Sequence, residues 1–254
     1  MAVDSPTPVA SEGLPPLTPG TLYLVATPIG NQEDITLRAL RTLQQCDLIA
    51  AEDTRRTGSL LAHFKISKRM VSCFEFNERH RSQEILQRLK AGEKVAVVSD
   101  AGSPGISDPG ERLVKAAIEA GLRVEAVPGA CALVAGLTAS GLSTEEFHFV
   151  GFLPHKTGQR RRQLEGLRNV PGTWVLYESP YRVEKLLGEL KDIYPEHRVV
   201  LARELTKRHE EFLRGTPSEL AAQWELRPRK GEFVVMIEAA EGKPKSISPE
   251  TSPD

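Results

Sequence analysis

Short apolar runs alternate with amphipathic stretches through the first half of the chain. The runs at 21–26, 47–51 and 95–98 are short, mostly apolar and bounded by turn residues, which is typical of buried parallel strands. Between them, apolar residues recur at helical spacing, as at 35–45 and 78–90. This repeated strand–helix order predicts a doubly wound, mostly parallel sheet.

The texture of the sequence changes after residues 143–146. An aromatic-rich run at 147–153 opens a second unit with shorter connections, which predicts a mixed sheet. The fold class is therefore α/β, with an N-terminal domain at 20–143 and a C-terminal domain at 144–241. We expect Asp34 and Ser218 to cap helices. The remaining Pro- and Ser-rich ends, 1–19 and 242–254, are expected to be disordered tails.

Composition narrows the class of protein. The chain has 254 residues and a net charge of −1, which gives no overall basis for binding nucleic acid or a membrane. Its three cysteines are far apart without a CxxC pair, and its six histidines show no metal-ligand spacing. We expect a cytoplasmic protein without disulfide or metal, because there is also no secretory signal and no run long enough to span a membrane.

One loop stands out as a candidate ligand site. The strand at 95–98 runs into Ser99–Gly110, which holds three glycines and two prolines, and a helical pattern starts at Glu111. The loop is about twice the usual length of a strand-to-helix connection. Ligands of open α/β sheets bind at the carboxyl ends of strands, so this loop is interpreted as the floor of a cofactor site.

Several common enzyme classes lack their motifs. The turn after the first strand, ATPIGN at 26–31, has one glycine and does not match the dinucleotide fingerprint GxGxxG. No GxxxxGK[ST] loop and no GxSxG elbow occur, which disfavours P-loop nucleotidases and α/β-hydrolases.

Six segments in order resemble a known family. They are LVATPIGN at 24–31, DITLRA at 34–39, AEDTR at 51–55, SDAGSPGISDPG at 99–110, VPG at 127–129 and YESPYR at 177–182. Together they are similar to the small-subunit ribosomal RNA methyltransferases that 2'-O-methylate a cytidine ribose, within the tetrapyrrole methylase superfamily. The resemblance covers about residues 20–240 and leaves the tails outside it.

The resemblance implies fold, cofactor and partner. It implies two αβα domains with S-adenosylmethionine in the cleft between them, a homodimer, and small-subunit (16S) ribosomal RNA as substrate. The superfamily's Gly-Pro-Gly-Asp turn is replaced here by Pro28-Ile29-Gly30-Asn31, which favours RNA over a tetrapyrrole. The cofactor-binding residues that it implies are Ile29, Ala101, Gly102, Ser103, Ile106, Cys131, Ala132, Glu178 and Ile237.

The chemistry of methyl transfer adds candidate catalytic residues. A ribose hydroxyl is a weak nucleophile near neutral pH, so a general base or a charge-stabilising group should assist it. The carboxylates that follow predicted strands are Asp53, Asp100, Glu178 and Glu204. The sequence does not identify which of them is the base. Asp100, Glu178 and Asp53 are taken as the candidate catalytic residues.

Local basic runs supply candidate RNA contacts in an otherwise neutral chain. Phosphates require cations, so the residues expected to bind RNA are Arg55, Arg56, Arg79, Arg160, Arg161, Arg162, Lys207 and Arg208. Two alternatives stay open: a tetrapyrrole or other small-molecule methylase of the same fold, and a non-catalytic RNA-binding assembly factor.

Overall fold

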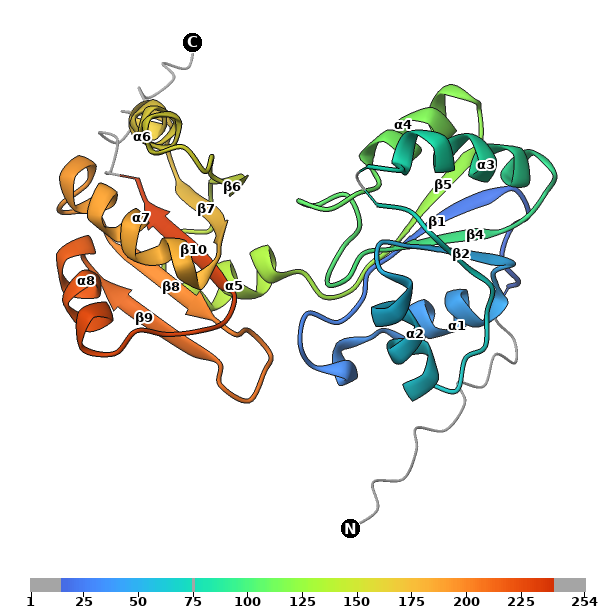
Figure 1. Cartoon of the computed structure of the whole chain (residues 1–254), viewed down its shortest axis with the longest axis horizontal. Helices are drawn as coiled ribbons and strands as arrows, with labels where there is room; N and C mark the ends of the chain where they lie inside the picture. Colours follow the sequence, from blue (N-terminus) through green and yellow to red (C-terminus); the bar gives the residue numbers. More distant parts are fainter. Residues whose placement is uncertain (1–14, 75, 240–254) are drawn as a thin grey trace, which may run out of the picture. The chain divides into compact units, whose positions relative to one another are not determined.

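The computed structural model describes residues 15–74 and 76–239 (Figure 1). Contacts divide the chain into two compact units, Met1–Ala132 and Leu133–Asp254, which are taken in turn. Each unit is built on its own five-stranded sheet, so the predicted α/β class is confirmed.

The N-terminal unit is a parallel sheet in the order β3-β2-β4-β1-β5. Every strand pair in it is parallel. The central strand β4 is buried at all four residues, as its continuous apolar run predicts. The strands are β1 (Thr21–Val25), β2 (Leu48–Ala51), β3 (Met70–Ser72), β4 (Val95–Val98) and β5 (Arg123–Val127).

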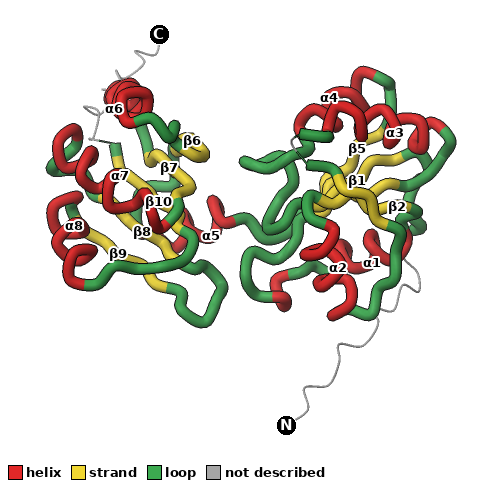
Figure 2. The backbone as a smooth tube through the Cα atoms, viewed as in Figure 1, coloured by secondary structure: helices red, strands yellow, loops and turns green. Residues whose placement is uncertain are grey.

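Helices cover both faces of this sheet and form three layers (Figures 1 and 2). One apolar core joins the sheet to α1 (Leu37–Gln45) and α2 (Thr54–His63) through side chains such as Leu43 and Leu61. The other core joins it to α3 (Glu78–Lys90) and α4 (Glu111–Glu119). The 3-10 helix η1 (Gln32–Asp34) lies between β1 and α1. Because all five strands run parallel, their carboxyl ends lie at one edge of the sheet, where ligands of such folds bind.

The C-terminal unit has a mixed sheet in the order β6-β7-β10-β8-β9. Only β6 and β7 pair in parallel, and the other pairs are antiparallel, as expected from the short connections. One face packs on α6, α7 and α8 around Trp174 and Leu190. The elements are α5 (Ala132–Ser140), β6 (Phe147–Phe152), α6 (Thr157–Gly166), η2 (Leu167–Asn169), β7 (Thr173–Glu178), α7 (Pro180–Ile193), β8 (Val199–Arg203), β9 (Glu211–Gly215), α8 (Pro217–Leu226) and β10 (Phe233–Glu238).

Helix α5 moves the expected domain boundary. A Cβ at Gly136 would lie 3.2 Å from a methyl of Val234, and the Leu133 N–H donates to the Tyr177 hydroxyl at 3.1 Å. The helix therefore packs on the second sheet, and the units divide after Ala132 rather than near residue 143.

The tails and caps also differ in detail from the sequence expectations. Within the predicted tail at 1–19, Leu17 packs on the first core and the Thr18 N–H donates to the Tyr23 hydroxyl, so its described residues are ordered. Residues 1–14 and 242–254 lie outside the described residues. Thr36 rather than Asp34 caps α1, and Thr216 rather than Ser218 caps α8 within a full capping box.

Candidate active site

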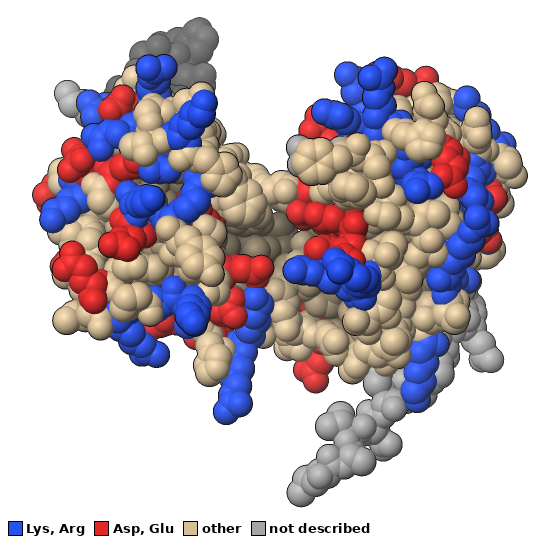
Figure 3. All heavy atoms as spheres, in the orientation of Figure 1, with Lys and Arg blue, Asp and Glu red and all other residues tan. Residues whose placement is uncertain are grey.

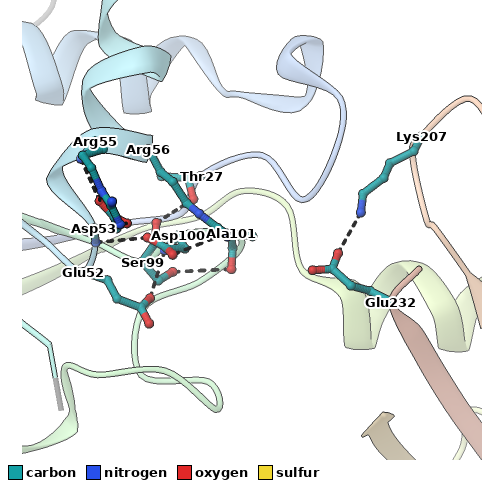
Figure 4. A network of polar contacts seen from close by, with 10 residues as sticks. All are labelled: Thr27, Glu52, Asp53, Arg55, Arg56, Ser99, Asp100, Ala101, Lys207 and Glu232. Atoms are coloured by element: carbon teal, nitrogen blue, oxygen red, sulfur yellow. Dashed lines mark hydrogen bonds and ion pairs between the residues drawn. The ribbon is translucent and has the colours of Figure 1, made fainter. Parts of the chain in front are cut away.

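The ends of β1 and β4 are tied together at the start of the long loop. Thr27 and Gly102 exchange both backbone hydrogen bonds, at 2.9 and 3.0 Å. The Thr27 hydroxyl donates to the Ser99 carbonyl at 3.2 Å (Figure 4). The Ser99 hydroxyl donates to the Gly102 carbonyl at 3.2 Å. These bonds fix the backbone of the turn after β1 and the start of the 99–110 loop, which contain several of the predicted cofactor residues.

Three predicted cofactor positions converge beside this pair. Gly102 has a φ of +83°, and a Cβ built there would lie 3.4 Å from Ile29 Cγ2 and 3.7 Å from the Ala130 carbonyl oxygen. Nearby, a Cβ on Gly129 would lie 2.9 Å from that of Ala26. The structure thus brings the turns after β1, β4 and β5 to one place, with Cys131 next in the chain, and we call this convergence of turns the cradle. Glycine is favoured at Gly102 by its positive φ and at Gly129 by the close approach of Ala26.

The rest of the loop is held by its own backbone. The Gly105 N–H donates to the Pro109 carbonyl at 3.2 Å, and the Ile106 N–H donates to the Ser103 carbonyl at 3.3 Å. Ser107 has a φ of +62°, in the left-handed region. Ala101 and Ile106 are exposed, so the loop presents backbone and an apolar side chain to a ligand.

Asp100 and Asp53 lie together on the α2 side of the same sheet edge. The Asp53 N–H donates to Asp100 Oδ1 at 3.1 Å, and Arg56 Nη1 lies 3.4 Å from Asp100 Oδ2. Figure 4 shows the Arg56 side chain reaching from α2 toward Asp100. The side chain of Asp100 is 23% exposed, so it combines a fixed orientation with access to a ligand.

Asp53 has a different role from Asp100. Its carboxylate caps α2 by accepting from the Arg55 N–H at 2.8 Å, and it accepts two further bonds from the Arg55 guanidinium. The Arg55 hydrogen bonds hold the pKa of Asp53 well below its usual range. A carboxylate so fully engaged is a weak base, which leaves Asp100 as the better candidate of the two.

Two further acids at this edge were not among the predicted site residues. The Asp100 N–H donates to Glu52 Oε2 at 3.0 Å. Burial and the nearby charges of Glu52 and Asp100 raise the pKa of Asp108 to about 7 against a hydrogen bond from Ser99. Both residues belong to the motifs at 51–55 and 99–110, so position relative to strand ends could have identified them.

Glu178 is buried in the C-terminal unit rather than open to a ligand. Its side chain is 1% exposed, Oε1 accepts from the Ser179 N–H at 2.7 Å, and Arg182 Nε lies 3.2 Å away. Burial raises the pKa of this carboxyl. The arginine in turn donates to the Leu153 carbonyl at 2.6 Å. The expectation that the Glu178 carboxylate is catalytic is therefore corrected, because it anchors Arg182 inside the unit.

Ile237 and Glu204 also have structural surroundings. Ile237 is 0% exposed within the core of the second unit, so its side chain is not available as the predicted cofactor contact. Glu204 has a φ of +50° and accepts from Lys207 Nζ at 2.9 Å and from the Glu232 N–H at 3.0 Å. Lys207 also pairs with Glu232 at 2.7 Å (Figure 4). Because Glu204 binds both Lys207 and the Glu232 N–H, its carboxylate stabilises the turn after β8.

The predicted RNA-binding residues divide by exposure. On the face shown in Figure 3, basic side chains are mixed with acidic ones in both units. Arg161 pairs with Asp192 at 2.9 Å, and Lys207 is held as described above. Those that are exposed and form no ion pair with another described residue are Arg79, Arg162 and Arg208.

Arg160 is a correction to the predicted RNA surface. Its guanidinium donates to both oxygens of Glu189 at 2.7 Å, and the two side chains are 4% and 8% exposed. A third bond goes to the His155 carbonyl. This buried, bidentate pair joins α6 to α7 and leaves Arg160 unavailable to a phosphate.

The described residues show two further absences. No helix among them is long and apolar enough to cross a membrane. No group of three or more histidine, cysteine or acidic side chains in the same residues could hold a metal ion.

Comparison with known proteins decides the family. The family model of tetrapyrrole (corrin/porphyrin) methylases matches residues 21–221. The chain belongs to this family. It is 49% identical over 91% of its length to ribosomal RNA small subunit methyltransferase I of Halalkalibacterium halodurans, covering 79% of that protein. It is 50% identical over 87% of its length to the protein of the same name from Synechocystis, covering 80% of it. The protein is therefore a methyltransferase.

Solved structures agree on the fold. The crystal structure of uroporphyrin-III-C-methyltransferase from Thermus thermophilus superimposes with a TM-score of 0.61 at 21% identity, covering 86% of this chain and 94% of that one. The same enzyme complexed with S-adenosyl homocysteine gives a TM-score of 0.60 at 23% identity, covering 85% and 96%. At these identities the likeness concerns architecture, and the acceptor has to be argued from the site.

Proposed function

We propose that this methyltransferase uses S-adenosylmethionine to methylate the 2'-oxygen of a cytidine ribose in small-subunit (16S) ribosomal RNA. The convergence of Ile29, Gly102 and the Ala130 carbonyl at the carboxyl ends of the strands supports a ligand site there. The choice of S-adenosylmethionine rests on the methylase family and on the S-adenosyl homocysteine complex of a protein with the same fold. The relatives named ribosomal RNA small subunit methyltransferase I support ribosomal RNA as the acceptor. The cytidine and its 2'-oxygen rest on the motif resemblance.

Different residues of the N-terminal unit would bind the cofactor and assist the reaction. When bound, S-adenosylmethionine supplies a methyl group activated by its sulfonium sulfur. The backbone of 101–106 would hold the cofactor's polar groups, with Ile29, Cys131 and Ala132 against it. Asp100 would accept the proton of the ribose hydroxyl, and its bond from the Asp53 N–H would hold it in line.

The second unit and the surface would contribute less directly. The backbone at Glu178 remains a proposed cofactor contact. Arg55, Arg56, Arg79, Arg161, Arg162, Lys207 and Arg208 are proposed to meet RNA phosphates. A ribosomal substrate would place the protein in the cytoplasm, and a homodimer is expected, which light scattering would test.

A transfer assay tests the proposal. The purified protein is incubated with radiolabelled S-adenosylmethionine and either assembled small subunits or deproteinised 16S RNA from cells that lack this protein. Nucleosides are then separated and identified by mass spectrometry. We expect label in 2'-O-methylcytidine. Label on the cytosine base would contradict ribose methylation. In a parallel reaction with uroporphyrinogen III in place of RNA, label on that compound but none on RNA would favour a tetrapyrrole acceptor.

Cofactor binding is the matched control. Calorimetry with S-adenosyl homocysteine should show binding by the wild-type protein and a marked loss for Gly102→Val, whose side chain would meet Ile29. If the wild-type protein bound small subunits but did not bind S-adenosyl homocysteine, a non-catalytic assembly factor would be favoured.

A further inference from the structure

A cavity of about 310 Å³ lies in the N-terminal unit beside Asp100. Its walls come from the turn after β1, the end of β4 and the first two turns of α2. The volume is at the lower end of the range for small-molecule sites, about 300 Å³. It therefore suits one nucleotide better than a larger molecule.

The cavity is distinct from the cofactor cradle in its lining. None of the residues proposed to touch the cofactor lines it. Pro28 and Gly30 line it, whereas Ile29 between them directs its side chain toward Gly102. Ser99 and Asp100 line it, whereas the loop that follows forms the cradle. The paired Thr27 and Gly102 backbones thus lie at the junction of the two sites.

The lining chemistry fits a nucleotide. Arg56 supplies a cation whose side chain is 68% exposed, and Asp100 supplies the carboxylate 3.4 Å from it. Thr57, the hydroxyl of Ser59 and the apolar side chain of Leu60 form the rest of the α2 wall. A nucleotide presents an anionic phosphate, the hydroxyls of its ribose and the face of its base.

We propose that this cavity holds the acceptor nucleotide of the RNA, with its phosphate at Arg56 and its ribose at Asp100. The proposal rests on the proposed function and assigns its acceptor site. The carbon–sulfur bond of the donor breaks, leaving the neutral thioether, while the 2'-oxygen forms the new bond to the methyl carbon. The hydroxyl proton passes to Asp100, which afterwards loses it to solvent.

Filling the cavity tests the assignment. Leu60→Trp adds bulk to the α2 wall, and Ala62→Trp adds the same side chain at an exposed position of that helix which does not line the cavity. With small subunits as substrate, we expect Leu60→Trp to lower kcat/KM by about tenfold or more. Ala62→Trp should stay within about twofold of wild type. Both variants should bind S-adenosyl homocysteine with wild-type affinity.

Arg56 tests the phosphate contact. Arg56→Gln should raise KM about tenfold with little change in kcat, and Arg56→Lys should recover much of the loss, since a phosphate needs the charge. Equal behaviour of the two tryptophan variants would overturn the assignment. So would a parallel loss of S-adenosyl homocysteine affinity in Leu60→Trp, which would give the cavity to the cofactor. Wild-type protein that methylates no RNA would instead remove the proposed function itself.

Discussion

The carboxylate of Glu78 accepts the backbone N–H of Gly110 at 3.0 Å, across 32 positions of sequence. It also accepts from the Leu113 N–H at 3.4 Å. Gly110 is the N-cap residue of α4 and provides no side-chain hydrogen bond, so the buried Glu78 at the start of α3 replaces the missing cap. Through this bond the end of the 99–110 loop is anchored to α3, the neighbouring helix on the same face of the sheet.

Removing this cap should destabilise the N-terminal unit. Glu78→Ala leaves the Gly110 N–H buried without an acceptor, and we expect a loss of about 1–3 kcal/mol in the free energy of unfolding. Glu78→Gln keeps an acceptor oxygen and should lose less. Urea denaturation followed by circular dichroism measures both.

The matched control is Glu111→Ala, an exposed acid in the first turn of α4. Its loss should stay below about 1 kcal/mol, because it acts only on the helix dipole. If Glu78→Ala were no more destabilising than Glu111→Ala, the long-range cap would be refuted.

Asp100→Asn should separate chemistry from binding. The amide oxygen can still accept the Asp53 N–H, but it cannot take up a proton. We therefore expect kcat to fall about 100-fold or more, with S-adenosyl homocysteine affinity and thermal midpoint close to wild type. Asp47→Asn, an exposed acid before β2 that pairs with Lys94, is the control. A kcat near wild type for Asp100→Asn would exclude it as the base.

The sheet architecture could be predicted because strand burial and helix periodicity are written into neighbouring residues. The bounds of α3 match the expected 78–90. Helix caps were harder to predict from the sequence, because Thr36 and Asp34 are both common capping residue types. Only the backbone conformation at Thr36 lets the side-chain oxygen accept the Ala39 N–H.

Side chains that depend on distant partners could not be predicted. Arg160, Arg161 and Arg162 are equivalent in composition, yet only Arg160 falls on the same side of α6 as Leu164 and meets Glu189 of α7. Ile237 lies in a strand that is apolar on both faces, so alternation could not indicate which side its residues occupy. For residues 101–106 the glycine spacing indicated the turn conformation of the backbone, with Gly102 and Gly105 at positive φ, and their contact with a cofactor stays a prediction.

The Arg160–Glu189 pair yields a stability prediction. Arg160→Met leaves a buried carboxylate unpaired, and we expect a loss of about 3–5 kcal/mol. The double variant Arg160→Met, Glu189→Leu should recover most of it, because two apolar residues replace the pair. Thermal and urea unfolding measure both variants. If the double variant did not regain the lost free energy of unfolding, the pair would contribute more to stability than charge neutralisation.

Asp108 should make stability depend on pH. Its folded pKa of about 7 exceeds the unfolded value of 3.8, so the folded state holds the proton more tightly. The stabilisation is complete below about pH 4 and is lost as pH rises through 7. Asp108→Asn should remove this slope between pH 4 and pH 8, measured as the thermal midpoint. Glu119→Gln, an exposed acid of α4, should keep the wild-type slope, and an unchanged slope in Asp108→Asn would contradict the assignment.

The exposed arginines should govern the salt dependence of RNA binding. Arg162 and Arg208 are exposed and form no ion pair with another described residue, so each can release a counterion on meeting a phosphate. Arg162→Gln or Arg208→Gln should weaken binding to small subunits and reduce the slope of log K against log salt by about 1. In folded Arg160→Met protein the slope should stay unchanged, because that guanidinium is already bound to Glu189. Filter binding at several salt concentrations measures the slopes, and a reduced slope for Arg160→Met would place its guanidinium on RNA after all.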